Sequence, residues 1–208
     1  AGHRGLVDVR ASAARRETSN VIGEIGPEDA TRVVMAGAHR DSVACYNTAE
    51  GGKVGAKAPV SWKDLTNPVF KGKVVMPHPA SSGTGYLTIA AWLQVWGEAD
   101  AWKFMDALHE NIAQYTHSGS KPCRQAGAGE FPIGVSFEYR AVTTKKSGAP
   151  IDIIFPTEGL GWDLESSGIM KNTKKLDAAK ALMDWMVTPE AMALYAKNFA
   201  VLAMPGVA

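Results

Sequence analysis

The sequence predicts an α/β protein, and three observations support this. Short apolar segments of the buried-strand type alternate with segments whose apolar residues recur at helical spacing. The 208 residues, 46% of them apolar, are enough for one large domain or two small lobes with a core. The formal net charge of +1 gives no global attraction to nucleic acid or anionic membranes, so a charged ligand must be captured locally.

Residues 1–43 differ in composition from the rest of the chain. They contain six arginines and no lysine, whereas residues 44–208 contain fourteen lysines and two arginines. Both residue types serve about equally well on solvated surfaces, so the switch indicates a junction rather than a chemical need. Strand patterns occur in GLVDVRAS, SNVIGEIG and RVVMAGA, with a turn at GPEDA. We expect the RVVMAGA strand to join a sheet with VACYNT or SSGIMKN.

The remainder of the chain alternates strands and helices. GKVVMPHP, FPIGVSFE and PIDIIFP predict buried strands, and helical spacing occurs in GYLTIAAWLQVWG and EADAWKFMDALHENI. Two C-terminal helices, KLDAAKALMDWMV and TPEAMALYAKNFA, are split where Thr188 is a candidate N-cap and Pro189 occupies the first helical position. Four tryptophans on helical apolar faces are expected in the core: Trp92, Trp96, Trp102 and Trp185.

Residues 18–43, TSNVIGEIGPEDATRVVMAGAHRDSV, resemble a strand segment of the secreted di-zinc aminopeptidases, which ends in Gly-Ala-His-x-Asp-Ser. The resemblance implies that His39 binds zinc and that Asp41 orients the site. That family's other metal ligands have no match downstream, and zinc needs three or four protein ligands. We therefore expect no metal and no cofactor, with His39 at the end of a structural strand.

Residues 46–208 resemble the periplasmic substrate-binding proteins of ABC importers, in particular those that bind 2-aminoethylphosphonate. The similarity lies in colinear motifs that include YNT, HSGSKPC, GVSFEYR and FPTEGLGWDLESSGIMKN. It implies a type II periplasmic-binding-protein-like lobe with crossover strands and C-terminal helices, periplasmic localisation, and an ABC transporter permease as partner. The bulk of that family's first lobe is absent, so the chain looks chimeric. A β-rich segment over residues 1–43 replaces the first lobe and precedes a binding domain over residues 44–208. An apolar face left by the absent lobe would favour a homodimer.

Two turns of small residues are candidate anion-binding sites. HPASSGTGYLTIAAW predicts a strand end, a turn and a helix that opens near Thr84 or Gly85. Free N–H groups and the dipole at a helix start attract anions, and glycine lets a phosphonate approach the backbone. YTHSGSKP repeats this pattern before a helix that starts near Lys121 or Pro122. Either the turns are ordinary helix caps or, as the resemblance implies, they bind ligand through Ser81, Ser82, Gly83 and Thr84 and through Ser118, Gly119 and Ser120.

The ammonium end of such a ligand requires a carboxylate or an aromatic face. SFEYR places Glu138 and Tyr139 at the end of an apolar strand, and Arg140 is a further candidate contact to the phosphonate. The alternative for Glu138 is an acid that stabilises a helix N-terminus. Glu158, on the glycine-bearing crossover EGLGWDLES, is another acid of interest, and this segment could act as a hinge.

The chemistry expected is binding without catalysis. No catalytic constellation is visible, and the five histidines fit no short metal-binding spacing. We expect capture of a small phosphonate such as 2-aminoethylphosphonate for ABC-type import. The alternatives are a zinc aminopeptidase-like remnant and a folded scaffold without activity.

The cysteines and the apolar segments limit the chain's setting. Cys45 and Cys123 are too few for a disulfide framework, so two separate buried thiols are preferred over a single bridge. No run of eighteen apolar residues exists, so direct membrane insertion is not expected. The N-terminus lacks the apolar core of a signal peptide, which indicates a cytosolic chain or one in mature, truncated or engineered form.

Overall fold

The computed structural model describes residues 34–170, 172–197 and 201–202. The described residues divide into two compact units, of which the first contains residues 34–39, 164–170, 172–197 and 201–202 and the second contains residues 40–163. The strands predicted in GLVDVRAS and SNVIGEIG lie outside the described residues. The described strands are β1 (Val34–Asn47), β2 (Val74–Pro77), β3 (Ile112–Thr116), β4 (Ile133–Phe137), β5 (Ile151–Ile154), β6 (Gly161–Ser167) and β7 (Val201–Leu202). The described helices are α1 (Thr48–Lys53), α2 (Gly83–His109), α3 (Lys121–Gly127), α4 (Glu138–Lys146), α5 (Leu176–Met186) and α6 (Pro189–Lys197), with two 3-10 helices, η1 (Lys63–Thr66) and η2 (Pro68–Phe70).

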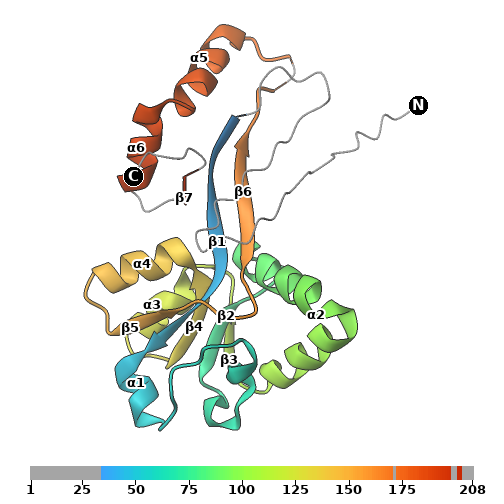
Figure 1. Ribbon diagram of the computed structural model, residues 1–208, viewed down its shortest axis with the longest axis vertical. Coiled ribbons are helices and arrows are strands. Elements are labelled where there is room, and N and C mark those ends of the chain that lie inside the picture. Colours follow the sequence, from blue (N-terminus) through green and yellow to red (C-terminus); the bar gives the residue numbers. More distant parts are fainter. Residues whose placement is uncertain (1–33, 171, 198–200, 203–208) are drawn as a thin grey trace. The chain divides into compact units, whose positions relative to one another are not determined.

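A mixed sheet forms the centre of the second unit (Figure 1). Its strand order is β3-β2-β4-β1-β5. Strand β2 pairs in parallel with β3 and β4, whereas β1 pairs antiparallel with β4 and β5. This arrangement confirms the predicted α/β class. Because β3, β2 and β4 are neighbouring parallel strands, their carboxyl ends lie at the same edge of the sheet.

Strand β1 separates two layers of core. Ala44 and Tyr46 belong to the apolar cluster that contains Trp92 and Phe104 of α2. Val43 and Cys45 belong to the cluster that contains residues of α3 and α4. Successive side chains of a strand point to opposite faces, so α2 covers one face of the sheet and α3 and α4 cover the other. Residues of both faces of VACYNT are apolar, so this part of β1 is buried on both sides of the sheet.

The pairing expected for RVVMAGA is partly wrong, because VMAGA and VACYNT are parts of the same strand, β1. A β-bulge at Ser42 bends this strand without ending it, and the pairing register with β4 shifts between Asp41 and Val43. Strand β6, which includes the first two residues of SSGIMKN, does pair with β1. The amino-terminal part of β1 also pairs with β7, with Gly37 opposite Leu202. The predicted boundary after residue 43 falls within β1 and stays a prediction.

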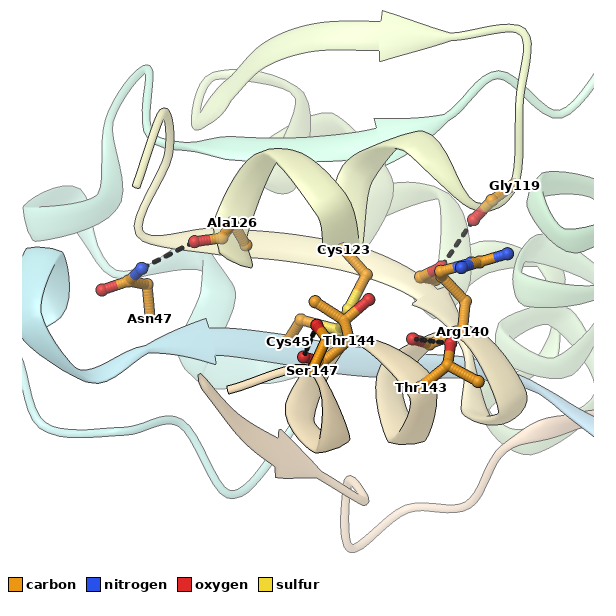
Figure 2. The surroundings of a disulfide bond; sticks show 10 residues. Cys45, Asn47, Gly119, Cys123, Ala126, Arg140, Thr143, Thr144 and Ser147 are labelled. Atoms are coloured by element: carbon orange, nitrogen blue, oxygen red, sulfur yellow. Dashed lines mark hydrogen bonds between the residues drawn. A yellow bond between two sulfur atoms is a disulfide. The ribbon is translucent and has the colours of Figure 1, made fainter. Parts of the chain in front are cut away.

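Cys45 and Cys123 form a disulfide, so the expectation of two separate thiols is wrong (Figure 2). Cys45 lies on β1 and Cys123 on α3, and their Cα atoms are 5.4 Å apart although 78 residues separate them in the chain. Both side chains are fully buried in the same apolar cluster. Sequence spacing could not reveal the pairing, because it arises from the packing of α3 on the sheet.

The helix boundaries largely follow the predicted signals. The two helices predicted over residues 85–112 form α2, which is kinked at Gly97, where a φ of 76° favours glycine. Ser82 caps α2 by accepting a hydrogen bond from the Gly85 N–H. Thr188 and Pro189 open α6 as predicted, with the Ala191 N–H donating to Thr188 Oγ1 at 3.2 Å. None of the described helices is long and apolar enough to cross a membrane.

The tryptophans divide into buried and exposed side chains. Trp92 is 2% exposed and meets Phe104 edge to face, as expected for a core residue. Trp102 is 50% exposed and Trp185 is 43% exposed, so the prediction that both lie in the core is wrong. Helical spacing identifies a continuous apolar face but does not show how much of that face another element covers.

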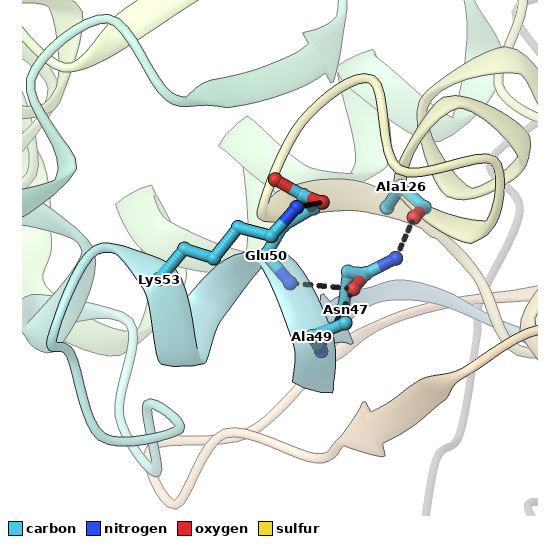
Figure 3. A network of polar contacts seen from close by, with 5 residues as sticks. All are labelled: Asn47, Ala49, Glu50, Lys53 and Ala126. Carbon is cyan, nitrogen blue, oxygen red and sulfur yellow. Dashed lines mark hydrogen bonds and ion pairs between the residues drawn. The ribbon is translucent and has the colours of Figure 1, made fainter.

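Asn47 fastens the end of β1 to two neighbouring helices (Figure 3). Its side-chain oxygen accepts hydrogen bonds from the N–H groups of Ala49 and Glu50 at 3.0 and 2.9 Å, which caps α1. Its side-chain amide donates to the Ala126 carbonyl of α3 at 2.6 Å. One buried residue therefore anchors β1, α1 and α3 together.

Candidate functional site

The three segments predicted to bind ligand follow the ends of neighbouring parallel strands. The first turn comes after β2, the second after β3, and Glu138 directly after β4. The N–H of His78 donates to the carbonyl of Thr116 at 2.7 Å and joins the ends of β2 and β3. Open α/β sheets commonly bind ligands outside the carboxyl ends of their strands. The topology thus collects these segments at the edge where a ligand site is expected.

Gly119 brings the two turns into contact. A Cβ atom at Gly119 would lie 2.5 Å from Thr84 Oγ1 and 3.3 Å from Ser82 Oγ, so there is no room for a side chain. The Ser136 hydroxyl, at the end of β4, donates to the Gly119 carbonyl at 2.6 Å and holds the second turn in place. Ser81 Oγ lies 2.9 Å from His117 Nδ1, which joins the turns a second time.

The hydroxyl groups of the turns have different tasks. Thr84 donates its hydroxyl hydrogen to Asp41 Oδ1 at 3.0 Å, so this group supports the start of α2. Ser82 Oγ accepts from the Gly85 N–H and keeps its own hydrogen for another acceptor. Ser118 Oγ and Ser120 Oγ are 3.0 Å apart.

Backbone donors in both turns lack acceptors. Among the residues that the structure describes, none accepts a hydrogen bond from the N–H groups of Gly83, Thr84, Ser118 or Gly119. The first two belong to the first turn of α2, where the helix dipole adds positive potential. The contacting turns therefore present unfilled N–H donors that suit an anion.

Glu138, Tyr139 and Arg140 form the first turn of α4. Glu138 Oε1 lies 3.4 Å from Arg40 Nη1, and the Arg140 guanidinium lies 5.9 Å from the centre of the Tyr139 ring. Within the described part of the chain, Glu138 Oε2 and Arg140 Nε are buried without a hydrogen-bond partner. Buried polar atoms are usually satisfied, so these two are available to a polar ligand.

Three basic side chains near these segments were missed by the sequence analysis. Arg124 donates to Ser120 Oγ at 3.1 Å and places a guanidinium beside the second turn. Its position four residues after Ser120 in a helical segment is a signal that could have found it. His117 could have been found by its place inside the turn motif, whereas Arg40 meets Glu138 across 98 residues and left no local signal.

The residues of the aminopeptidase-like motif have a structural task where they are described. Asp41 is buried and accepts the hydroxyl hydrogen of Thr84. The side chain of His39 lies outside the described residues. Among those that are described, no three His, Cys, Asp or Glu side chains lie close enough to hold a metal ion.

Glu158 caps η1. Its carboxylate accepts hydrogen bonds from the Ser61 hydroxyl at 2.5 Å and from the Trp62 N–H at 3.1 Å. Burial by itself raises the pKa of this carboxyl, but hydrogen bonds from the Ser61 side chain and from nearby backbone N–H groups outweigh it. The pKa of Glu158 therefore lies below its ordinary value. This carboxylate stabilises a local turn, and the hinge role of its segment stays a prediction.

The chain matches a known family of proteins over most of its length. The sequence profile of the bacterial extracellular solute-binding protein family matches residues 19–208, a range that includes most of the aminopeptidase-like segment. An uncharacterized protein of Haemophilus influenzae is 41% identical over 71% of this chain and 43% of its own length. The spermidine/putrescine-binding periplasmic protein of Escherichia coli is 24% identical over 67% of this chain and 41% of its own.

Solved structures agree with the profile. The periplasmic binding protein AfuA from Actinobacillus pleuropneumoniae, with fructose-6-phosphate bound, matches with a TM-score of 0.72 and 36% identity, covering 82% of this chain and 54% of AfuA. The periplasmic binding protein P5PA matches with the same TM-score and 31% identity, covering 83% of this chain and 56% of P5PA. The chain thus spans about half the length of these relatives. Since the family profile covers far more than half of the chain, the protein belongs to the bacterial extracellular solute-binding protein family.

Proposed function

We propose that the chain binds a small phosphonate such as 2-aminoethylphosphonate, without catalysis, as part of an ABC-type importer. The observation that carries this proposal is the contact of Gly119 with Thr84 and Ser82. It joins two small-residue turns at the ends of adjacent parallel strands, where a tetrahedral anion meets donors from both turns.

The phosphonate group is held by backbone N–H donors and by the Ser82 hydroxyl. Arg124 adds positive charge on the side of the second turn. A charge-assisted hydrogen bond contributes roughly 1.5 to 3 kcal/mol net. Four or five of them exceed the ordering cost of association by enough for a micromolar dissociation constant, to within an order of magnitude.

The ammonium group of the ligand is assigned to Glu138. Its Oε2 atom is buried without a partner among the described residues, and an ammonium ion would donate a charge-assisted hydrogen bond to it. Arg140 Nε, which is also buried without a partner among the described residues, donates a hydrogen bond to an oxygen of the same ligand. An aminoalkyl phosphonate carries both groups, a phosphonate for the N–H donors of the turns and an ammonium for Glu138.

The relatives define the competing ligands. AfuA was solved with fructose-6-phosphate bound, and a phosphate ester has the same doubly charged tetrahedral head as a phosphonate. The Escherichia coli relative is named for spermidine and putrescine, which are cations. The disulfide fits an oxidising compartment and therefore supports a periplasmic setting. The transporter permease as partner rests on family membership.

Calorimetric titration of the 208-residue chain tests the proposal. We expect 2-aminoethylphosphonate to bind more tightly than fructose-6-phosphate or inorganic phosphate, and spermidine to bind weakly. Gly119→Ala inserts a methyl group against Thr84, and overpacking of about 1 to 3 kcal/mol should weaken binding about tenfold or more. Gly52→Ala is the matched control, because a Cβ there meets nothing within 4 Å. Unchanged binding by Gly119→Ala, or a preference for spermidine, would contradict the anion site.

The two alternatives have distinct signatures. Stoichiometric zinc in metal analysis would favour the aminopeptidase-like remnant. An inactive scaffold would not be stabilised by ligand, whereas a bound ligand at a hundred times its dissociation constant adds about 2.7 kcal/mol to the free energy of unfolding. A melting temperature that does not move in millimolar phosphonate would favour the scaffold.

A further inference from the structure

A cavity of about 320 Å³ lies in the second unit between α2 and the ends of β2 and β3. Its floor is mostly apolar and includes Met76, Trp92 and Leu108, all of them buried, and the Trp92 indole N–H has no hydrogen-bond partner among the described residues. His78 and Pro79, which line the cavity, lead from β2 into the first turn, and Tyr115 precedes the second turn, but none of residues 81–84, 118–120 or 138–140 lines it. Small-molecule sites in proteins typically have volumes of about 300 to 1,000 Å³, so the cavity is large enough for a small ligand.

Aromatic rings form the walls of this cavity. The Trp102 side chain lines it and remains half exposed. The imidazole of His109 stacks on the Tyr115 ring at 5.8 Å between centroids, and His109 Nδ1 lies 2.9 Å from the Tyr115 hydroxyl. His78 meets the same ring edge-on at 5.8 Å. Tyr115 is thus fixed from two sides, while Trp102 offers an uncovered ring face to an occupant.

The charge at this cavity has a single sign. Among the described residues, Asp106 is the one carboxylate that lines it, and no lysine or arginine does. The neighbouring Lys103 pairs with Asp100, which leaves Asp106 without an ion pair among the described residues. A carboxylate beside aromatic ring faces attracts a cation, because both the charge and the ring quadrupoles favour it.

We propose that this cavity is a second binding site, and that its ligand is a small organic ammonium ion with an apolar body. The apolar body lies on the Met76, Trp92 and Leu108 floor. The ammonium group lies at the mouth, near Asp106 and the face of Trp102. This site adjoins the anion site, because His78 lines the cavity and its carbonyl accepts hydrogen bonds from the first turn, but it holds a ligand of the opposite charge.

The proposal is tested with 2-phenylethylamine, with 2-phenylethanol as its uncharged counterpart and 3-phenylpropanoate as its anionic one. Titrations are followed by two-dimensional NMR at about pH 8, where imidazole in water is uncharged. A cation–π contact and an exposed ion pair together correspond to roughly a tenfold preference for the amine over the alcohol. The carboxylate should bind more weakly than the alcohol, and shifts should be confined to residues around the cavity.

Variants separate the charge from the apolar contacts. Asp106→Asn should weaken amine binding about threefold to fivefold, the upper part of the range for an exposed ion pair, and leave the alcohol unaffected. Asp100→Asn is the matched control, because Asp100 lies on the same helix, pairs with Lys103 and does not line the cavity. Trp102→Ala should weaken both ligands. Equal binding of amine and alcohol, equal effects of the two Asp→Asn variants, or no saturable binding of the amine would each overturn the proposal.

Discussion

The disulfide between Cys45 and Cys123 should be one of the largest single contributions to the stability of the second unit. It closes a loop of 78 residues. The loss of chain entropy in the unfolded state, for a loop of this length, corresponds to about 4.5 kcal/mol at 25 °C. Native strain and residual structure usually reduce the measured value, so we expect a decrease of about 3 to 4.5 kcal/mol in the free energy of unfolding on reduction.

Urea unfolding curves of oxidised and reduced protein measure this difference. The comparison leaves the amino-acid composition unchanged, and the reduced thiols still fill the buried space that the disulfide occupies. Both curves are followed by tryptophan fluorescence and far-ultraviolet circular dichroism. The double variant Cys45→Ala/Cys123→Ala is the control, because reductant should not move its unfolding midpoint.

The same bond should affect ligand binding indirectly. Cys123 lies in α3, which follows directly after the second turn, and the disulfide ties this helix to β1. Reduction should therefore weaken phosphonate binding while the reduced protein stays folded in the absence of urea. If reductant shifts the midpoint of the native sequence no more than that of the double variant, the two cysteines do not form the bond and the placement of α3 on β1 is wrong.

Three further predictions concern Asn47, the tryptophans of α2, and Glu158. Asn47→Ala removes the acceptor that caps α1 and the donor to the Ala126 carbonyl, so it should destabilise by about 1 to 3 kcal/mol, and Asn47→Asp should destabilise by at least as much because it buries a carboxylate oxygen against that carbonyl; chemical unfolding measures both. Trp92→Ala should destabilise by about 3 to 5 kcal/mol, because it empties a buried site. Trp102 is half exposed, so Trp102→Ala should lower the free energy of unfolding by much less. Equal decreases for the two variants would contradict the burial of Trp92 and the exposure of Trp102. Because the pKa of Glu158 is lower in the folded state than in the unfolded state, its ionised carboxylate stabilises the fold at pH values above the unfolded pKa of 4.5. This stabilisation is lost as the pH falls through the folded pKa. We expect Glu158→Gln to lower the free energy of unfolding by less than about 1 kcal/mol, because the group is largely solvated. This difference from the native protein should be constant at neutral pH and shrink in acid. A difference that grows in acid would contradict the hydrogen bonds at η1.

Family membership supports much of what the sequence predicted. The fold class, binding without catalysis and a periplasmic or extracellular setting are those of the solute-binding protein family. The aminopeptidase resemblance of residues 18–43 did not predict the task of Asp41, which holds the start of α2 through Thr84. A short motif can match a strand of another family, because strands that end in small and polar residues serve many folds.

Local features were the reliable part of the prediction. The strand in GKVVMPHP, the break at Gly97 and the cap at Thr188 depend on side-chain periodicity and backbone preference within a few residues. The two small-residue turns were recognisable for the same reason, since each stands between a strand end and a helix start. The exposure of Trp102 was not predictable, because it depends on what packs against α2.

The order of strands and helices and the turn chemistry at their ends could be read from the sequence, because hydrophobic periodicity and capping act over a few neighbouring residues. Only the tertiary structure decided that Gly119 touches Thr84, that Arg40 reaches Glu138 and that Cys45 meets Cys123. These contacts depend on strand order and pairing register, which place residues side by side across 35 to 98 positions of chain. No local pattern encodes such neighbours, so most candidate binding groups could be listed from the sequence, but the contact between the two turns could not be predicted.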